Sequence, residues 1–188
     1  MHWPTFDPSE EPLDVITKIS HFYGDGVEFV ISGGGNTSCK NDDHLWVKAS
    51  GTSLATVSPE GFVELDRAAL EETFLQDFDD DPTTREAQYK DALNAARIYP
   101  ERGQRGSVES LMHHAIPGRY VVHTHSTQMN KLTCSEGGEV LAQQLYGDDN
   151  IIWIPFVDPG YILSKVIHKA MGEYAQATGR DKPRAILL

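Results

Sequence analysis

The sequence predicts an α/β fold in a single domain over residues 1–188. Segments with apolar residues at helical spacing alternate along the chain with short, β-branched apolar runs. The length of 188 residues suits one domain, and the chain shows no repeats, low-complexity segments or linkers. The predicted helices are too numerous for an all-β barrel, which argues against a cupin-like module.

The N-terminal half begins with a predicted helix over residues 13–23, where apolar residues recur at helical spacing before Gly24. The β-branched run at residues 27–31 predicts a strand that stops at the glycine-rich stretch 32–36. The same reasoning predicts a strand at 45–49 that stops at Ser50-Gly51. The other elements of this half are a strand at 62–65, a helix at 67–74, an acidic loop at 77–81 and a helix at 86–98.

The C-terminal half begins with a predicted helix at 107–115, which starts at a hydroxyl residue and runs to Pro117-Gly118. A strand at 120–123, a helix at 138–145, a strand at 151–154, a helix at 161–176 and a strand at 184–188 follow. An apolar strand on the last residue indicates either a chain truncated at its C-terminus, the interpretation we favour, or an edge strand tied into the sheet.

Charge and composition restrict the partners. The net charge is −12, and no cluster of Lys or Arg offers a surface for nucleic acid or anionic lipid. We therefore expect a small-molecule partner, and neither nucleic acid nor membrane. Cys39 and Cys134 are too few for a disulfide scaffold, and the sequence shows no signal peptide and no apolar window of about 18 residues. These features predict a cytoplasmic protein.

The motif His123-Thr124-His125 follows the apolar run of the predicted strand 120–123. Residues i and i+2 of a strand point to one face, so both imidazoles are predicted to bind one cation. The alternative is a pair of packed histidines with backbone partners. A catalytic divalent ion normally needs about three protein ligands, and no other histidine has a spacing that singles it out.

Glu109 and His113 stand at i, i+4 and share a helical face just before that strand. A carboxylate there is a candidate proton donor and acceptor, or a metal ligand. The simpler interpretation is a glutamate that interacts with the helix dipole.

Two glycine- and hydroxyl-rich turns are candidate anion sites. Residues 33–38 and 50–53 present backbone N–H groups and hydroxyls without bulky side chains, and Lys48 and Arg105 are available nearby in sequence. Each turn alone is equally typical of a plain turn, but two of them together favour an anion pocket.

Four motifs together resemble the class II aldolase/adducin family, over about residues 13–188. They are Gly34-Gly35-Asn36-Thr37-Ser38, Lys48-Ala49-Ser50-Gly51-Thr52, Ser107-Val108-Glu109 with His113, and Val121-Val122-His123-Thr124-His125. The chain also resembles the aldolase-type domain of rhamnulose- and fuculose-phosphate aldolases, which favours a deoxyketose 1-phosphate as substrate.

This resemblance implies a three-layer α/β/α domain around a mainly antiparallel central sheet, assembled as a homotetramer. It implies a divalent metal, with zinc as the first expectation, held by His123 and His125. Glu109 would be the catalytic acid/base. The phosphate of a sugar phosphate would be held by Gly35, Asn36, Ser50, Gly51 and Ser107.

The resemblance also places a third metal histidine in an Asn-His-Gly turn that follows a strand like residues 185–188, so this ligand is expected just beyond Leu188. The implied activity is that of a metal-dependent aldehyde-lyase, which cleaves a ketose 1-phosphate to dihydroxyacetone phosphate and an aldehyde. A sugar-phosphate epimerase or dehydratase would use the same residues. A non-catalytic, adducin-like interaction domain is the alternative from another functional class.

Overall fold

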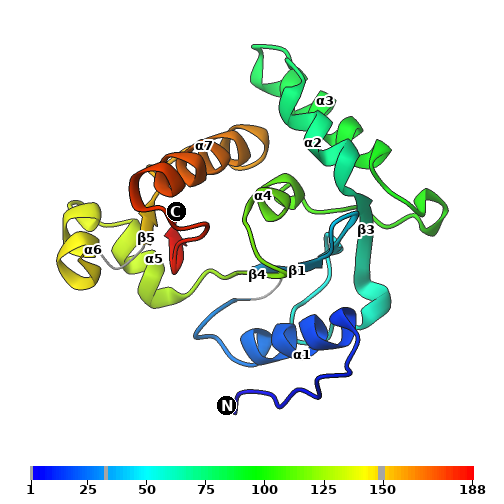
Figure 1. Cartoon of the computed structure of the whole chain (residues 1–188), viewed down its shortest axis with the longest axis horizontal. Coiled ribbons are helices and arrows are strands. Elements are labelled where there is room, and N and C mark those ends of the chain that lie inside the picture. Colours follow the sequence, from blue (N-terminus) through cyan, green and yellow to red (C-terminus); the bar gives the residue numbers. More distant parts are fainter. Residues whose placement is uncertain (1, 32–33, 148–150) are drawn as a thin grey trace.

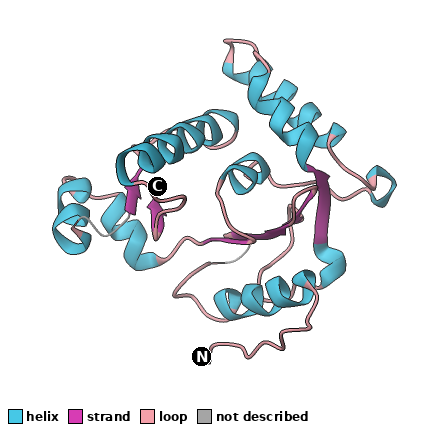
Figure 2. Cartoon of the chain, in the orientation of Figure 1, coloured by secondary structure: helices cyan, strands magenta, loops and turns pink. Residues whose placement is uncertain are grey.

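A four-stranded sheet separates helices on both of its faces in the computed structural model, which describes residues 2–31, 34–147 and 151–188 (Figure 1, Figure 2). Helix α1 (Pro12–Gly24) packs on β1 (Asn36–Lys40) at one face. Helix α4 (Ser110–Ala115) lies at the other face, against β2 (His44–Lys48) and α7 (Tyr161–Thr178). The predicted three-layer arrangement is therefore confirmed.

The sheet has the order β3-β2-β1-β4, with antiparallel pairing throughout. Its outer strands are β3 (Phe62–Asp66) and β4 (Tyr120–His123). A second, two-stranded sheet pairs β5 (Ile151–Trp153) in parallel with β6 (Ala185–Leu187). The prediction of a mainly antiparallel sheet is confirmed. The register of β1 and β4 sets Asn36 opposite His123.

Strand β1 is entirely buried although it is composed mostly of polar residues. On the α1 side, the Thr37 hydroxyl lies 2.6 Å from that of Ser20, and Cys39 joins an apolar cluster with Ile16. On the α4 side, Ser38 and Lys40 form hydrogen bonds with His113. Each polar side chain thus has a partner, which is the condition for burying it.

The strand predicted at 27–31 is wrong. Residues 27–29 form a turn, and residues 30 and 31 have no regular structure. Val27 and Ile31 are both exposed, while Val30 is buried. A β-branched run forms a strand only where a sheet edge accepts it, and here β1, which begins after the glycines, occupies the sheet instead. Ser32 and Gly33 of the predicted turn lie outside the described residues.

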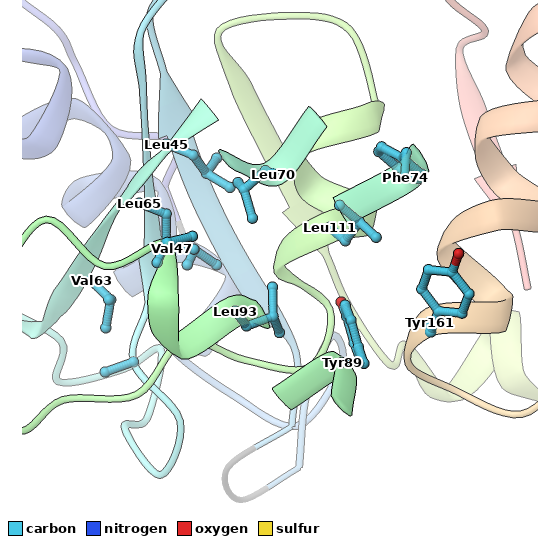
Figure 3. Packing of buried hydrophobic residues seen from close by; sticks show 12 residues of the cluster. Leu45, Val47, Val63, Leu65, Leu70, Phe74, Tyr89, Leu93, Leu111 and Tyr161 are labelled. Atoms are coloured by element: carbon cyan, nitrogen blue, oxygen red, sulfur yellow. The ribbon is translucent and has the colours of Figure 1, made fainter. Parts of the chain in front are cut away.

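The main apolar core lies between the sheet and α2 (Arg67–Leu75), α3 (Pro82–Ala95), α4 and α7 (Figure 3). Leu45 and Leu65 from the sheet pack in one cluster with Leu111 of α4. Tyr89 of α3 is buried in this cluster, and its hydroxyl donates to the carbonyl oxygen of Val108 at 2.7 Å. The core therefore fixes the segment just before α4.

Helix boundaries differ from the predictions at several places. Helix α3 begins at Pro82, where the Asp81 side chain accepts the Thr84 N–H, and it ends before residues 96–98. Residues 107–109 precede α4 instead of belonging to it. Helix α5 (Thr127–Thr133) had no prediction, and α6 spans Gly138–Tyr146. Short 3-10 helices span Pro59–Gly61 and Pro100–Arg102. Within the described residues, no helix combines the length and apolarity needed to cross a membrane.

Candidate functional site

Three elements bring their ends together at one place: the start of β1, the end of β4 and the N-terminus of α4. Asn36 begins β1 and stands opposite His123, the last residue of β4. Glu109 is the residue before α4, and His113 follows it by one helical turn. Ser107 and Asn36 both donate to the Glu109 Oε2 atom at 3.4 Å.

Glu109, His113 and His123 offer a set of metal-ligating atoms. One ligand atom from each of the three side chains lies within 4.8 Å of the others. The His123 Nδ1 atom is 3.3 Å from Glu109 Oε2, an ion-pair distance without hydrogen-bond geometry. The buried nitrogens His113 Nε2 and His123 Nδ1 have no hydrogen-bond partner among the described residues. Orphaned imidazole nitrogens beside a carboxylate fit a divalent metal site.

The charge states of this cluster also suit a cation. Burial raises the pKa of Glu109, but the contact with His123 and the hydrogen bond from Asn36 outweigh it and bring that pKa to about 2. Burial lowers the pKa of His113 to about 3. At neutral pH the cluster therefore contains a carboxylate and an uncharged His113 ring.

His125 lies beside this cluster. Its ring centroid is 4.8 Å from that of His123, with 30° between the ring planes. The predicted pairing of the two rings assumed a strand that continues to residue 125, whereas β4 ends at His123. The fold places the His123 ring next to the Glu109 carboxylate. The role of His125 as a metal ligand stays a prediction.

Sequence reasoning did not single out His113 as part of the site. Its i, i+4 spacing from Glu109 was the available signal, because that spacing places both residues on one side of the first helical turn. The spacing does not predict that β1 and β4 lie beside α4. This tertiary arrangement brings His113 next to His123.

The residues predicted to hold phosphate divide into two groups. Gly35, Asn36 and Ser107 lie at the cluster: Asn36 and Ser107 contact Glu109, and a Cβ on Gly35 would lie 2.9 Å from the His123 carbonyl oxygen. Ser50 and Gly51 belong to the turn after β2, where the Ser50 N–H donates to the carbonyl oxygen of Arg105. This bond ties the second turn to the segment that leads to Ser107, and the phosphate role of all five residues stays a prediction.

Lys48 is buried at the end of β2. Its ammonium donates to the carbonyl oxygen of Thr52 at 2.7 Å and so holds the turn that contains Ser50 and Gly51. Burial lowers the pKa of Lys48, while the charge of Glu109 acts in the opposite direction. Lys48 thus provides positive charge between the second turn and the cluster.

Comparison with known proteins identifies a family. The sequence profile of the "Class II Aldolase and Adducin N-terminal domain" matches residues 21–188. A protein of Bacillus subtilis (strain 168), described as the uncharacterized oxidoreductase YuxG, is 30% identical over 154 residues, which are 77% of this chain. The match covers 21% of that relative, so the chain spans about a fifth of its length.

Solved structures show the same fold. The N-terminal class II aldolase domain of a conserved protein from Thermoplasma acidophilum superposes with a TM-score of 0.81 at 23% identity, over 99% of this chain and 83% of that one. The L-fuculose-1-phosphate aldolase of Thermus thermophilus gives a TM-score of 0.52 at 15% identity, over 94% of this chain and 74% of that one. At these identities the likeness shows the fold alone.

Proposed function

Because the chain belongs to the class II aldolase and adducin N-terminal domain family, we propose that it is a metal-dependent aldehyde-lyase that cleaves a ketose 1-phosphate. The observation that carries the proposal is the Glu109 carboxylate 3.3 Å from the buried Nδ1 atom of His123, which has no hydrogen-bond partner in the described part of the chain. Glu109 and His123 would hold the divalent ion, for which zinc is our first expectation, and the third ligand would come from His113 or His125.

When bound, the ion would supply Lewis acidity toward the oxygen atoms of the substrate. Glu109 would provide the proton transfer, because it is the carboxylate of the cluster and its ionised form has the lone pairs that accept a proton. In retro-aldol cleavage it takes up the proton of the substrate hydroxyl that becomes the aldehyde. It then delivers this proton to the carbon that has lost the aldehyde, so that dihydroxyacetone phosphate is released.

We propose that the phosphate binds beside the cluster. The hydrogen bonds from Asn36 and Ser107 to Glu109 are long, at 3.4 Å, and are therefore easily exchanged for bonds to a phosphate oxygen. The backbone at Gly35 and Gly51 would add N–H groups without side-chain bulk. Ser50 would add its hydroxyl, because its own N–H donates to the carbonyl oxygen of Arg105. The fold shared with the L-fuculose-1-phosphate aldolase supports a deoxyketose 1-phosphate as the first substrate to test.

The experiment is a panel of ketose 1-phosphates incubated with the metal-loaded protein, with identification of the products. We expect dihydroxyacetone phosphate and an aldehyde, and a Glu109→Gln variant slower by about 10²–10⁴-fold because it cannot transfer a proton. Glu64→Gln is the matched control, since Glu64 also contacts a histidine, His44, at 2.7 Å but lies on β3 away from the cluster. Full activity in Glu109→Gln would contradict the proposed role.

Product identification also distinguishes the lyase from the alternative functions. An epimerase would return an isomeric sugar phosphate, and a dehydratase would release water without breaking a carbon–carbon bond. A non-catalytic, adducin-like interaction domain would show none of these products and would bind partners without metal. The buried orphan nitrogens favour a site over this interaction domain, because an unpartnered buried polar atom costs stability. Assembly as a homotetramer and a cytoplasmic location remain part of the proposal.

A further inference from the structure

One side of β1 holds helix α4 at three points. The alternate residues Asn36, Ser38 and Lys40 contact, in that order, the Glu109 carboxylate, the His113 ring and the C-terminal carbonyl oxygens of α4. Ser38 Oγ lies 2.8 Å from His113 Nδ1, and both side chains are fully buried. Either the Ser38 hydroxyl or the His113 Nδ1 nitrogen can be the donor in this contact, depending on which ring nitrogen carries the proton.

The neutral His113 ring can carry its proton on Nδ1 or on Nε2, and the hydrogen bonds that each form can make are different. A neutral imidazole has one N–H donor and one acceptor nitrogen, and a serine hydroxyl needs an acceptor for its own hydrogen. Among the described residues, His113 Nδ1 is the partner of the Ser38 hydroxyl. If Nδ1 carried the proton, the hydroxyl hydrogen would be buried without an acceptor, at a cost of about 1–3 kcal/mol. The Ser38 hydroxyl therefore donates to Nδ1.

The opposite nitrogen of the ring leads to the same result. Nε2 has no hydrogen-bond partner among the described residues and lies in the cluster with the Glu109 carboxylate. A lone pair on Nε2 would be repelled by this negative charge, whereas an N–H group would be attracted to it. Both ends of the ring thus favour the form with the proton on Nε2.

We infer that His113 is a positioning residue, set by Ser38, that presents its Nε2–H group to Glu109 and is not a ligand of the metal. This inference rests on the proposed metal site and narrows it: the ion is held by Glu109 and His123, with His125 as the ligand beside them. His113 acts through Glu109, by holding the carboxylate in place.

The first test is histidine nitrogen NMR on the full chain, without metal and loaded with ¹¹³Cd²⁺. We expect the His113 proton on Nε2 in both states, and a cadmium–nitrogen coupling to His123 but not to His113. A proton on Nδ1 of His113, or a cadmium coupling to its Nε2, would overturn the inference. If the wild-type chain bound no cadmium, the proposed function would fail, and the protonated nitrogen in the metal-free chain would still decide the inference.

The second test compares variants by competition with a chelator for Zn²⁺. His113→Gln keeps an N–H donor near the position of Nε2, so we expect metal affinity within a few-fold of wild type. His123→Gln removes a ligand and should lose more than the roughly 10–100-fold that is typical when only a partner of a ligand is removed. His113→Leu removes the donor and should slow turnover more than His113→Gln does. Equal losses of zinc affinity in His113→Gln and His123→Gln would show that His113 is a ligand.

The control for burial is Thr37→Val, which removes the hydroxyl bonded to Ser20 on the opposite side of β1. It removes one buried hydrogen bond from β1, as Ser38→Ala does. We expect both variants to lose a similar amount of stability, but only Ser38→Ala to change the His113 nitrogen shifts. A change of those shifts in Thr37→Val alone would contradict the assignment.

Discussion

Asn36 and His123 face each other across the antiparallel pairing of β1 and β4. Because of this pairing, two side chains from adjacent strands contact the Glu109 carboxylate. The Asn36 amide donates a hydrogen bond to it, and the His123 ring lies 3.3 Å from it. The site therefore depends on the register of β1 against β4, since a shift by one residue would turn either side chain to the other face of the sheet.

Asn36→Asp should raise the pKa of Glu109. The substitution replaces an amide donor at 3.4 Å with a second carboxylate, and two carboxylates at that distance do not both ionise readily. Carbon NMR titration of the metal-free protein measures the effect. Asn41→Asp is the control, because Asn41 is exposed and its side chain accepts only backbone N–H groups. A Glu109 pKa that stays the same in Asn36→Asp would show that the amide contact has no influence on the carboxylate.

Gly35→Ala should destabilise the protein more than Gly51→Ala does. Both glycines have positive φ, +74° and +84°, so each alanine pays about 1–2 kcal/mol for this backbone conformation. A Cβ on Gly35 would also lie 2.7 Å from Val30 Cγ1, whereas a Cβ on Gly51 meets open space. We expect an additional loss of about 1–3 kcal/mol for Gly35→Ala in urea unfolding. Equal losses would mean that the contacts at Gly35 relax freely.

Lys40→Met should lower the free energy of unfolding by about 1–3 kcal/mol, because it leaves the carbonyl oxygens at the end of α4 without a donor. Burial lowers the pKa of Lys40 to about 7, and the neutral amine still donates hydrogen bonds. Lys169→Met, at an exposed i, i+4 pair with Glu173, should change stability by less than about 0.5 kcal/mol. Similar values for the two variants in urea unfolding would contradict the anchoring role of Lys40.

The metal-free protein should lose stability as the pH falls from about 6.5 toward 3. The pKa of His113 is lowered from 6.5 to about 3 in the folded chain, and that of Glu109 from 4.5 to about 2. In this window the unfolded chain binds more protons than the folded one, so acid favours unfolding. Stability from these groups is complete above pH 6.5 and is lost as the pH falls through the folded pKa values.

His113→Gln isolates the share of that pH dependence which belongs to His113. Urea unfolding at about pH 7 and about pH 4.5, in the presence of a chelator, should show a smaller difference for the variant than for wild type. The lowered pKa values of His114 and His125 leave part of the slope in place. A difference as large as that of wild type would show that the pKa of His113 is not lowered in the folded chain.

The sequence predicted those helices and strands whose buried residues are apolar and recur at the period of the element. Strand β2 and helices α1 and α7 have apolar residues at the period of their structure, and their predicted positions are confirmed. Strand β1 was not predicted because its buried residues are polar and are satisfied by partners far away in sequence, such as Ser20 and His113. Local periodicity contains no trace of such partners.

The candidate site follows the same division. His123 was predicted from its position after a strand, and the role of Glu109 from the family resemblance; the structure brings the two residues together. His113 was not, because its role depends on the distance between α4 and β4, which no local pattern contains. The i, i+2 rule was applied to His125 beyond the end of the strand, where alternation no longer fixes the direction of a side chain.

The central claim is a divalent cation held at Glu109 and His123, and metal content per chain tests it most directly. Elemental analysis after mild purification and zinc loading should give about one ion per chain in wild type, and a loss of this ion in His123→Ala. His44→Ala is the matched control, because His44 also contacts a glutamate but lies on β2, and it should keep the ion. A wild-type chain without metal, or one ion per chain retained in His123→Ala, would contradict the claim.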